Sequence, residues 1–288
     1  MDLPAELLDQ IFSYLHLPPR WDRGQDPSRR DLCACRLVNH LWADAAYNHT
    51  FSAVAFDIAV SDSSLAADPK RLLTLAGVRD VLTSSPRLCQ AIESLSLLSD
   101  PTVPQRDLDV SALYAIFVIL PRLRYICLKE ICQRFKSVPR IQHEFRLHVD
   151  RIEVPVGLNL CAGSAEDLLH LTDMFEDIGE LSLPGLWLVK MGDNLSGRGG
   201  TRIRHIDYPG SMYNELSKVL HNFEINHLTS LTICPSRIWI QPKAWSRFCE
   251  LLRTIGSRLV HLGVHFGGRM EMYIGAICDY FSPRGSNG

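Results

Sequence analysis

The chain has 288 residues, of which 46% are hydrophobic and 22% are charged, a composition typical of a globular protein with a substantial core. Its formal net charge of −2 at pH 7 excludes the strong basic field that nucleic-acid binding requires, so no nucleic-acid partner is expected. No stretch approaches about 18 uncharged apolar residues, so no membrane span is expected. Because no secretory signal opens the sequence, we expect a cytoplasmic or nuclear protein with reduced cysteines.

Residues 2–15 are expected to form the first helix. Pro4 suits the first helical turn, where its missing N–H costs nothing, and Pro18 and Pro19 are expected to end the helix. Its apolar residues fall into two stripes at helical spacing. One stripe holds Leu3, Leu7, Ile11 and Leu15, and the other holds Leu8 and Phe12. Together the two stripes give this helix more apolar surface than one small core could cover.

Two further helices are expected before residue 51. Residues 17–30 carry no apolar period and are interpreted as an exposed loop. Ser28 or Asp31 can cap a second helix that runs through Val38. A third helix is predicted from Val38, Leu41, Trp42 and Ala45, which follow helical spacing. Such a small unit is marginal by itself, and its surplus apolar surface either packs on the rest of the chain or docks another protein.

These first fifty residues resemble an F-box. The resemblance lies in LPAELLDQIFSYL at residues 3–15, CRLVNHLW at residues 35–42 and NHTF at residues 48–51. The family pattern begins L-P-x-E, continues with two Leu or Ile residues and x-x-I, and later carries L-V shortly before a Trp. Residues 17–30 depart from it, because they are longer than the usual link between the first two helices.

The resemblance implies a partner and a set of contact residues. F-box motifs bind the Skp adaptor of the SCF (Skp–cullin–F-box) ubiquitin ligase, and through it the cullin. The residues that the resemblance assigns to the adaptor face, or to the small core behind it, are Leu3, Pro4, Leu7, Leu8, Ile11, Leu37 and Val38.

The remaining chain repeats a short pattern with apolar residues at i, i+3 and i+5. Seven stretches carry it, and their starts are 25 to 31 residues apart. They are Ile92/Leu95/Leu97, Leu123/Ile126/Leu128, Val149/Ile152/Val154, Ile178/Leu181/Leu183, Ile203/Ile206/Tyr208, Leu228/Leu231/Ile233 and Leu259/Leu262/Val264. The i+3 and i+5 pair alternates as a strand does. Helical patterns at 69–84, 110–120, 164–175, 211–223 and 242–255 separate several of them, which predicts parallel strands.

This pattern resembles the L-x-x-L-x-L core of leucine-rich repeats, although the Asn or Cys expected three positions later is absent from all seven stretches. We therefore predict an α/β protein. A three-helix F-box at residues 1–51 precedes an irregular, degenerate leucine-rich-repeat solenoid at 52–281, whose first strand lies within 51–60, and residues 282–288 form a disordered tail. A generic α/β domain with accidental repetition is the alternative. A solenoid exposes a concave strand face suited to protein binding.

No catalytic or metal-binding constellation stands out. Cys33 and Cys35, with His40 and His49, fit no common zinc-finger spacing, and no nucleophile, metalloprotease or dinucleotide motif occurs. We expect no metal, no cofactor and no enzymatic activity. Trp, Tyr and Arg dominate interface energetics, so the candidate substrate-binding residues are Tyr208, Arg237 and Trp239.

The expected function is that of a substrate receptor in an SCF-type E3 ubiquitin ligase. The helices hold the adaptor, and the repeat surface holds an unknown target protein, which proximity exposes to ubiquitin transfer. A non-ligase F-box scaffold is the first alternative. A hydrolase or transferase hidden in an α/β domain ranks below both.

Overall fold

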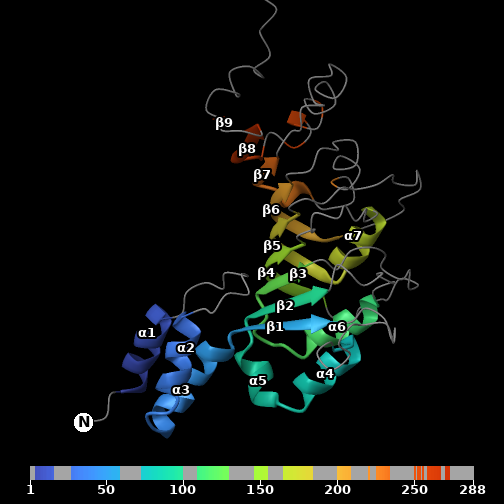
Figure 1. Cartoon of the computed structure of the whole chain (residues 1–288). Helices are drawn as coiled ribbons and strands as arrows, with labels where there is room; N and C mark the ends of the chain where they lie inside the picture. Colours follow the sequence, from blue (N-terminus) through green and yellow to red (C-terminus); the bar gives the residue numbers. More distant parts are fainter. Residues whose placement is uncertain are drawn as a thin grey trace, which may run out of the picture.

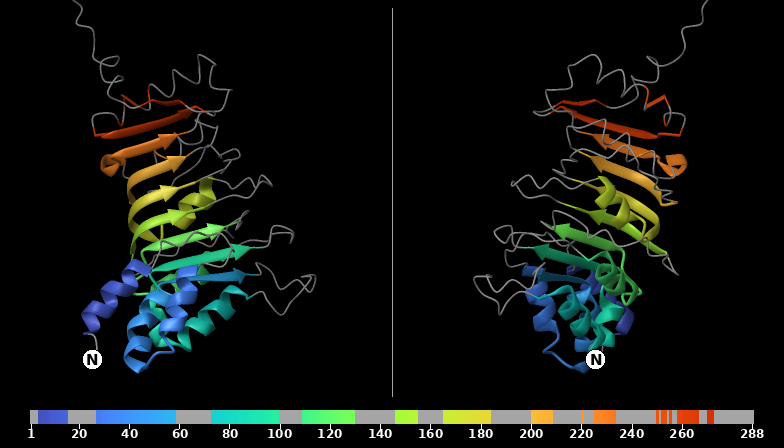
Figure 2. Two further views of the ribbon diagram at one scale, coloured as in Figure 1. Left: turned by 60° about the vertical axis from the view of Figure 1, so that its left-hand side comes forward. Right: turned by 90° about the vertical axis from the view of Figure 1, so that its right-hand side faces the viewer.

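A computed structural model describes a continuous architecture of helices followed by one sheet (Figures 1 and 2). The described residues are 4–15, 27–58, 73–99, 109–129, 146–154, 165–183, 200–208, 220, 225–233, 250, 252–253, 255, 258–266 and 270–272. The predicted loop at 17–30 lies largely outside them, and the predicted tail at 282–288 lies wholly outside.

Three helices open the described chain: α1 (Ala5–Leu15), α2 (Pro27–Cys35) and α3 (His40–Phe51). The prediction that the second helix runs through Val38 is wrong, because α2 ends at Cys35 and a turn follows. The cause is Asn39, whose extended backbone and side chain cap α3: its Oδ1 accepts a hydrogen bond from Trp42 N at 2.9 Å. Such a cap fixes where a helix begins, so residues 36–38 cannot continue α2.

The three helices share a small core of their own. Leu8, Phe12, Leu32 and Ala46 are each at most 2% exposed, and they form a cluster separate from the core under the sheet. The Phe12 and Trp42 rings pack edge to face, with centroids 5.7 Å apart, a favoured aromatic geometry. The predicted boundary after residue 51 falls where α3 ends.

The sheet contains nine strands in chain order among the described residues, and β1 to β8 are parallel. The strands are β1 (Ala53–Ile58), β2 (Ser94–Ser99), β3 (Tyr125–Lys129), β4 (Leu147–Glu153), β5 (Phe175–Ser182), β6 (Arg202–Tyr208), β7 (Ser230–Ile233), β8 (His261–Phe266) and β9 (Met270–Met272). The predicted parallel strands and first strand are confirmed. The antiparallel pairing of β9 with β8 was not predicted.

The register of the sheet follows the sequence repeat. The i+3 residues of all seven stretches pair across neighbouring strands, and each is at most 4% exposed. This row is Leu95, Ile126, Ile152, Leu181, Ile206, Leu231 and Leu262. Each repeat therefore adds one strand, and its buried residue stacks on the same residue of the next strand.

Helices cover the face of the sheet to which this row points. They are α4 (Leu75–Thr83), α5 (Pro86–Ala91), α6 (Val110–Val118) and α7 (Ala165–Thr172), with the short η1 (Ile225–His227) beside β6. Leu82, Leu113 and Leu168 share one buried cluster with the strands, and Figure 2 shows α6 and α7 on the same side of the sheet. The predicted helices at 211–223 and 242–255 lie mostly outside the described residues.

Candidate functional site

An exposed apolar stripe runs along α1. Leu7 is 46% exposed, Ile11 is 42% and Tyr14 is 86%, and the exposed Pro4 immediately precedes the helix. Positions 4, 7, 11 and 14 follow the three- and four-residue spacing of one helix face. Leu8 and Phe12 lie on the other face in the core. We call Pro4, Leu7, Ile11 and Tyr14 the α1 stripe.

A second exposed apolar pair lies in the turn between α2 and α3. Leu37 is 87% exposed and Val38 is 59%. The turn is tightened by backbone hydrogen bonds from Leu37 N to Ala34 O at 3.0 Å and from Val38 N to Cys35 O at 3.1 Å. These bonds and the Asn39 cap hold the turn in a shape that leaves both side chains in solvent.

Exposed apolar surface is concentrated on the helical unit. Among the described residues nine large apolar side chains are exposed, and five of them belong to α1 or the α2–α3 turn. The other four are Val81, Val118, Tyr125 and Val260. A gathering of large apolar side chains on a unit whose own core is complete is typical of a protein-binding surface.

The residues predicted for the adaptor face divide between surface and core. Pro4, Leu7, Ile11, Leu37 and Val38 are exposed, whereas Leu8 is 0% exposed and belongs to the core. Of the two places that the prediction left open, Leu8 therefore lies in the small core and not on the surface, because α2 and α3 cover it. Leu3 lies outside the described residues. Tyr14 was missed, although its position three residues after Ile11 places it on the same helix face.

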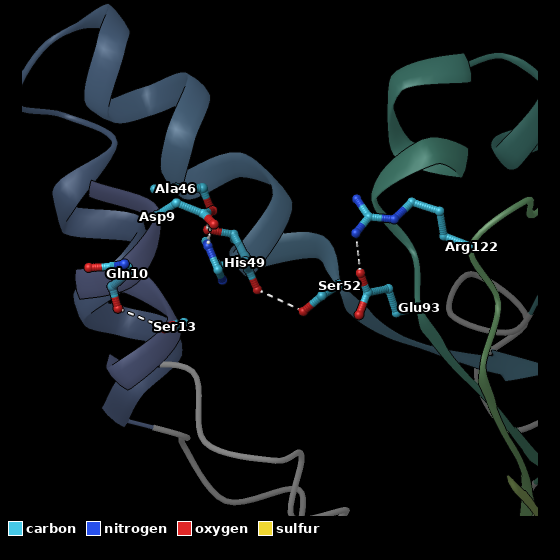
Figure 3. A network of polar contacts seen from close by, with 9 residues as sticks. Asp9, Gln10, Ser13, Ala46, His49, Ser52, Glu93 and Arg122 are labelled. Atoms are coloured by element: carbon cyan, nitrogen blue, oxygen red, sulfur yellow. Dashed lines mark hydrogen bonds and ion pairs between the residues drawn. The ribbon is translucent and has the colours of Figure 1, made fainter. Parts of the chain in front are cut away.

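A polar pair fixes the side of α1 that faces α3. His49 Nε2 lies 2.8 Å from Asp9 Oδ1, and the His49 side chain is 16% exposed whereas that of Asp9 is 68% exposed (Figure 3). The His49 ring also packs against Phe12, with centroids 6.1 Å apart. This contact holds α1 on α3 with Leu8 and Phe12 inward, and so turns the α1 stripe outward.

A very short junction joins the helical unit to the sheet. α3 ends at Phe51 and β1 begins at Ala53, so Ser52 alone separates them. The Ser52 carbonyl accepts hydrogen bonds from the backbone N–H groups of Glu93 and Ser94, each at 2.8 Å. Its hydroxyl donates to the carbonyl of His49 at 3.0 Å (Figure 3).

Arg87 of α5 strengthens the same junction from the side. Its guanidinium lies 2.7 Å from Asp44 and stacks over the Tyr47 ring at 4.2 Å. Arg36 lies over the same ring at 5.4 Å and over the Phe51 ring at 5.1 Å. Each exposed contact contributes little alone, but together they join α3 to α5 and fix the helical unit against the sheet.

Of the three predicted substrate-binding residues, Tyr208 alone lies within the described part of the chain. Tyr208 is 1% exposed, so its choice as a surface anchor is wrong: it is the i+5 residue of its repeat and points into the core with Ile206. Arg237 and Trp239 lie outside the described residues. The side chains that do occupy the opposite face include Tyr125, which is 41% exposed.

No catalytic group is apparent in the described part of the chain. No group of three or more His, Cys, Asp or Glu that could hold a metal ion occurs among the described residues. Burial raises the pKa of the Cys127 thiol to about 11, with a further rise from Glu153, so this thiol is protonated and unreactive at neutral pH. Burial also raises the pKa of Cys89. Within the described ranges, no helix is long and apolar enough to cross a membrane.

Comparisons with family models, with curated proteins and with solved structures found no significant match to this chain.

Proposed function

We propose that this chain is the substrate-recognition subunit of an SCF-type E3 ubiquitin ligase. In this proposal the helical unit is an F-box that binds a Skp-type adaptor and, through it, a cullin. The sheet with its helices is a degenerate leucine-rich-repeat solenoid that binds a target protein. The chain itself performs no bond chemistry and acts by holding the target near the ligase.

The observation that carries the proposal is the division of α1 into a covered and an uncovered face. Leu8 and Phe12 complete the core, while Leu7 and Ile11 remain nearly half exposed. All four belong to the sequence that resembles an F-box. A surface Leu and Ile that no element of the described chain covers, beside Tyr14, supports a partner that covers them.

The order of the sheet supports the second half of the proposal. Parallel strands added in chain order at intervals of 25 to 31 residues, with one buried residue of each repeat in a common row, are typical of a solenoid. The face opposite α4, α6 and α7 carries exposed side chains such as Tyr125. A target protein has a continuous strand face on which to bind.

The adaptor half is tested by a pull-down of the full chain with purified Skp-type adaptor. The double variant Leu7→Asp/Ile11→Asp places two charges in the proposed interface, and we expect adaptor affinity to fall about a hundredfold or more. The matched control is Val81→Asp/Val118→Asp, which changes two apolar side chains of similar exposure, 40% and 45%, on α4 and α6. The control is expected to bind normally.

Two outcomes would decide against the proposal. If the two double variants bind the adaptor equally well, the α1 stripe is not the adaptor-binding surface. If the unaltered chain does not bind the adaptor, the helical unit is not an F-box. Recovery of cullin with the adaptor complex separates a ligase receptor from a non-ligase scaffold. A scaffold retains the adaptor without cullin.

A further inference from the structure

The face of the sheet opposite the helices carries two rows of side chains, in which Tyr125 is exposed whereas small side chains such as Ser96 and Cys127 are buried. Because side chains alternate along a strand, the residues on either side of the buried row point away from the helices. The first row is Ser94, Tyr125, Arg151, Glu180 and His205, and the second is Ser96, Cys127, Glu153, Ser182 and Asp207. Neighbours within a row belong to adjacent strands.

Charges near the beginnings of the strands are already neutralised by one another. Four Arg side chains each pair with a carboxylate of a neighbouring repeat at 2.6 to 3.3 Å. The pairs are Arg122–Glu93, Arg124–Asp150, Arg202–Glu176 and Arg204–Asp177. Because cations and anions are equal in number and in close contact at this edge, the edge attracts a charged partner only weakly.

The face over β4 to β6 is not balanced in this way. Glu153 and Glu180 share one guanidinium, that of Arg151, which lies 3.4 Å from Glu153 and 3.5 Å from Glu180. Asp207 accepts a 3.2 Å hydrogen bond from the Ser182 hydroxyl. Lys129 of β3 is a second cation on this face, so among the described residues three carboxylates against two cations leave one negative charge in excess.

These carboxylates are also partly withdrawn from water. The side chains of Glu153 and Glu180 are 21% and 31% exposed. A carboxylate with little water and a shared counter-charge gains more from an added cation than a fully solvated one does. The excess charge therefore favours a ligand that brings Lys or Arg side chains to β4 to β6.

A second, independent observation points to a peptide backbone. The Ser94 hydroxyl, on a residue that is 5% exposed, has no hydrogen-bond partner, and neither has the buried Nε–H of Arg151. Both lie in the first row, on either side of Tyr125. Buried donors without acceptors are costly, and the carbonyl groups of an extended chain would satisfy them once the two side chains turn outward. Adjacent strands are about 4.8 Å apart, so the row from Ser94 to His205 spans about 19 Å, the length of about six extended residues.

We propose that this face binds an extended segment of a target protein that carries Lys or Arg side chains. Its basic side chains meet Glu153, Glu180 and Asp207, its backbone carbonyls meet Ser94 and Arg151, and Tyr125 packs against an aliphatic stem. The proposal deepens the receptor function above and rests on it, because the bound segment is taken to belong to the protein that the receptor delivers.

The test uses the full chain and fluorescein-labelled 12-residue peptides in fluorescence anisotropy. Each peptide has a Ser/Ala sequence that carries either three Lys, three Gln or three Glu, and the positions of these three residues vary across the series. We expect the best Lys peptides to bind about tenfold or more tightly than their Gln counterparts, with binding that weakens as salt is raised. Glu peptides should not bind.

The decisive variant is Glu153→Gln/Glu180→Gln/Asp207→Asn. Its matched control, Asp150→Asn/Glu176→Gln/Asp177→Asn, removes the same charge from the paired edge. Loss of the Lys preference in the first variant and its retention in the control support the proposal. If both variants lose it equally, the preference reflects net charge alone and the proposal falls. Thermal melting checks that each variant is folded, and the salt and peptide series on the unaltered chain decides the question if one is not.

Other results would overturn the inference without touching the adaptor assignment. A chain that captures adaptor but binds Lys, Gln and Glu peptides alike lacks the proposed preference. Sedimentation velocity that shows a dimer abolished by the first triple variant assigns the face to a second copy of the chain. Lys-selective binding by a chain that fails to capture adaptor would instead remove the receptor function and leave only a peptide-binding face.

Discussion

The contrast between Leu7 and Leu8 gives the sharpest test of how α1 is placed. The two leucines are adjacent and chemically identical, yet Leu7 is 46% exposed and Leu8 is 0% exposed. Truncating a fully buried Leu to Ala costs the transfer of its lost methyl groups and leaves a cavity, about 3 kcal/mol in total. Among the described residues, the core around Leu8 consists of Phe12, Leu32 and Ala46 with a few half-buried neighbours, so it has little capacity to fill the gap.

We therefore expect Leu8→Ala to destabilise the helical unit by about 3 kcal/mol, while Leu7→Ala changes its stability by about 0.5 kcal/mol or less. The assay is hydrogen exchange of the α1 to α3 backbone amides in the full chain, since a small unit can open while the sheet stays folded. Leu8→Ala should raise the exchange rates of these amides about a hundredfold. Amides of β4 to β6 serve as the internal control.

The inward position of Leu8 would be refuted if the two substitutions accelerated exchange equally, because α1 would then present both leucines to the core alike. It would also be refuted if Leu8→Ala left exchange unchanged while Leu7→Ala raised it. The same two variants should behave in the opposite order in the adaptor pull-down, provided that Leu8→Ala remains folded at the assay temperature.

Two further predictions concern the sheet. Gly179→Ala should lower the free energy of unfolding by about 2 kcal/mol, because a Cβ at this position would collide with the backbone carbonyl oxygen of Asp150. The control is Gly77→Ala in helix α4, which should be neutral or slightly stabilising because an added Cβ meets its neighbours at ordinary contact distances. Urea denaturation measures the free energy of unfolding of both variants. Iodoacetamide at pH 8 should label the exposed Cys33 and spare Cys127, whose pKa is raised to about 11, as peptide mass spectrometry will report. Labelling of native Cys127 at the rate of Cys33 would contradict its burial. Because an unfolded thiol has a pKa of 9.0, the contribution of Cys127 to stability is complete below pH 9 and is lost as the pH rises to about 11.

The strands could be predicted because their signal is local and repeated. Alternation of two buried residues identifies a strand, and recurrence at 25 to 31 residues identifies neighbours in a parallel sheet. Tyr208 shows the error that follows when this strand alternation is ignored in favour of residue type. Its place two residues after Ile206 predicts a core position, whereas its choice as an anchor relied on residue type alone.

The site on the helices could be predicted only in part. The spacing of α1 yields two apolar stripes, but which one is covered depends on Leu32 of α2 and Trp42 of α3, and these are tertiary contacts. The end of α2 was missed for a related reason. Apolar periodicity continues through Val38, and only the capping geometry of Asn39 stops the helix. The β9 pairing has no periodic signal in its three residues.

A receptor of the proposed kind, which works by proximity, would gain from a fixed distance between its two binding surfaces, and the junction at Ser52 would supply the physical basis for that fixed distance. A flexible tether lowers the effective concentration of a bound target as its length increases, and each freely rotating residue adds conformations that must be lost when the ends are held. Here one residue connects α3 to β1, and its carbonyl is bound to two backbone N–H groups that lead into β2. Arg87 joins α5 to Asp44 and Tyr47 on α3. The α1 stripe and the face over β4 to β6 therefore belong to one body, and a segment bound on that face would lie at a set position relative to whatever covers Leu7 and Ile11.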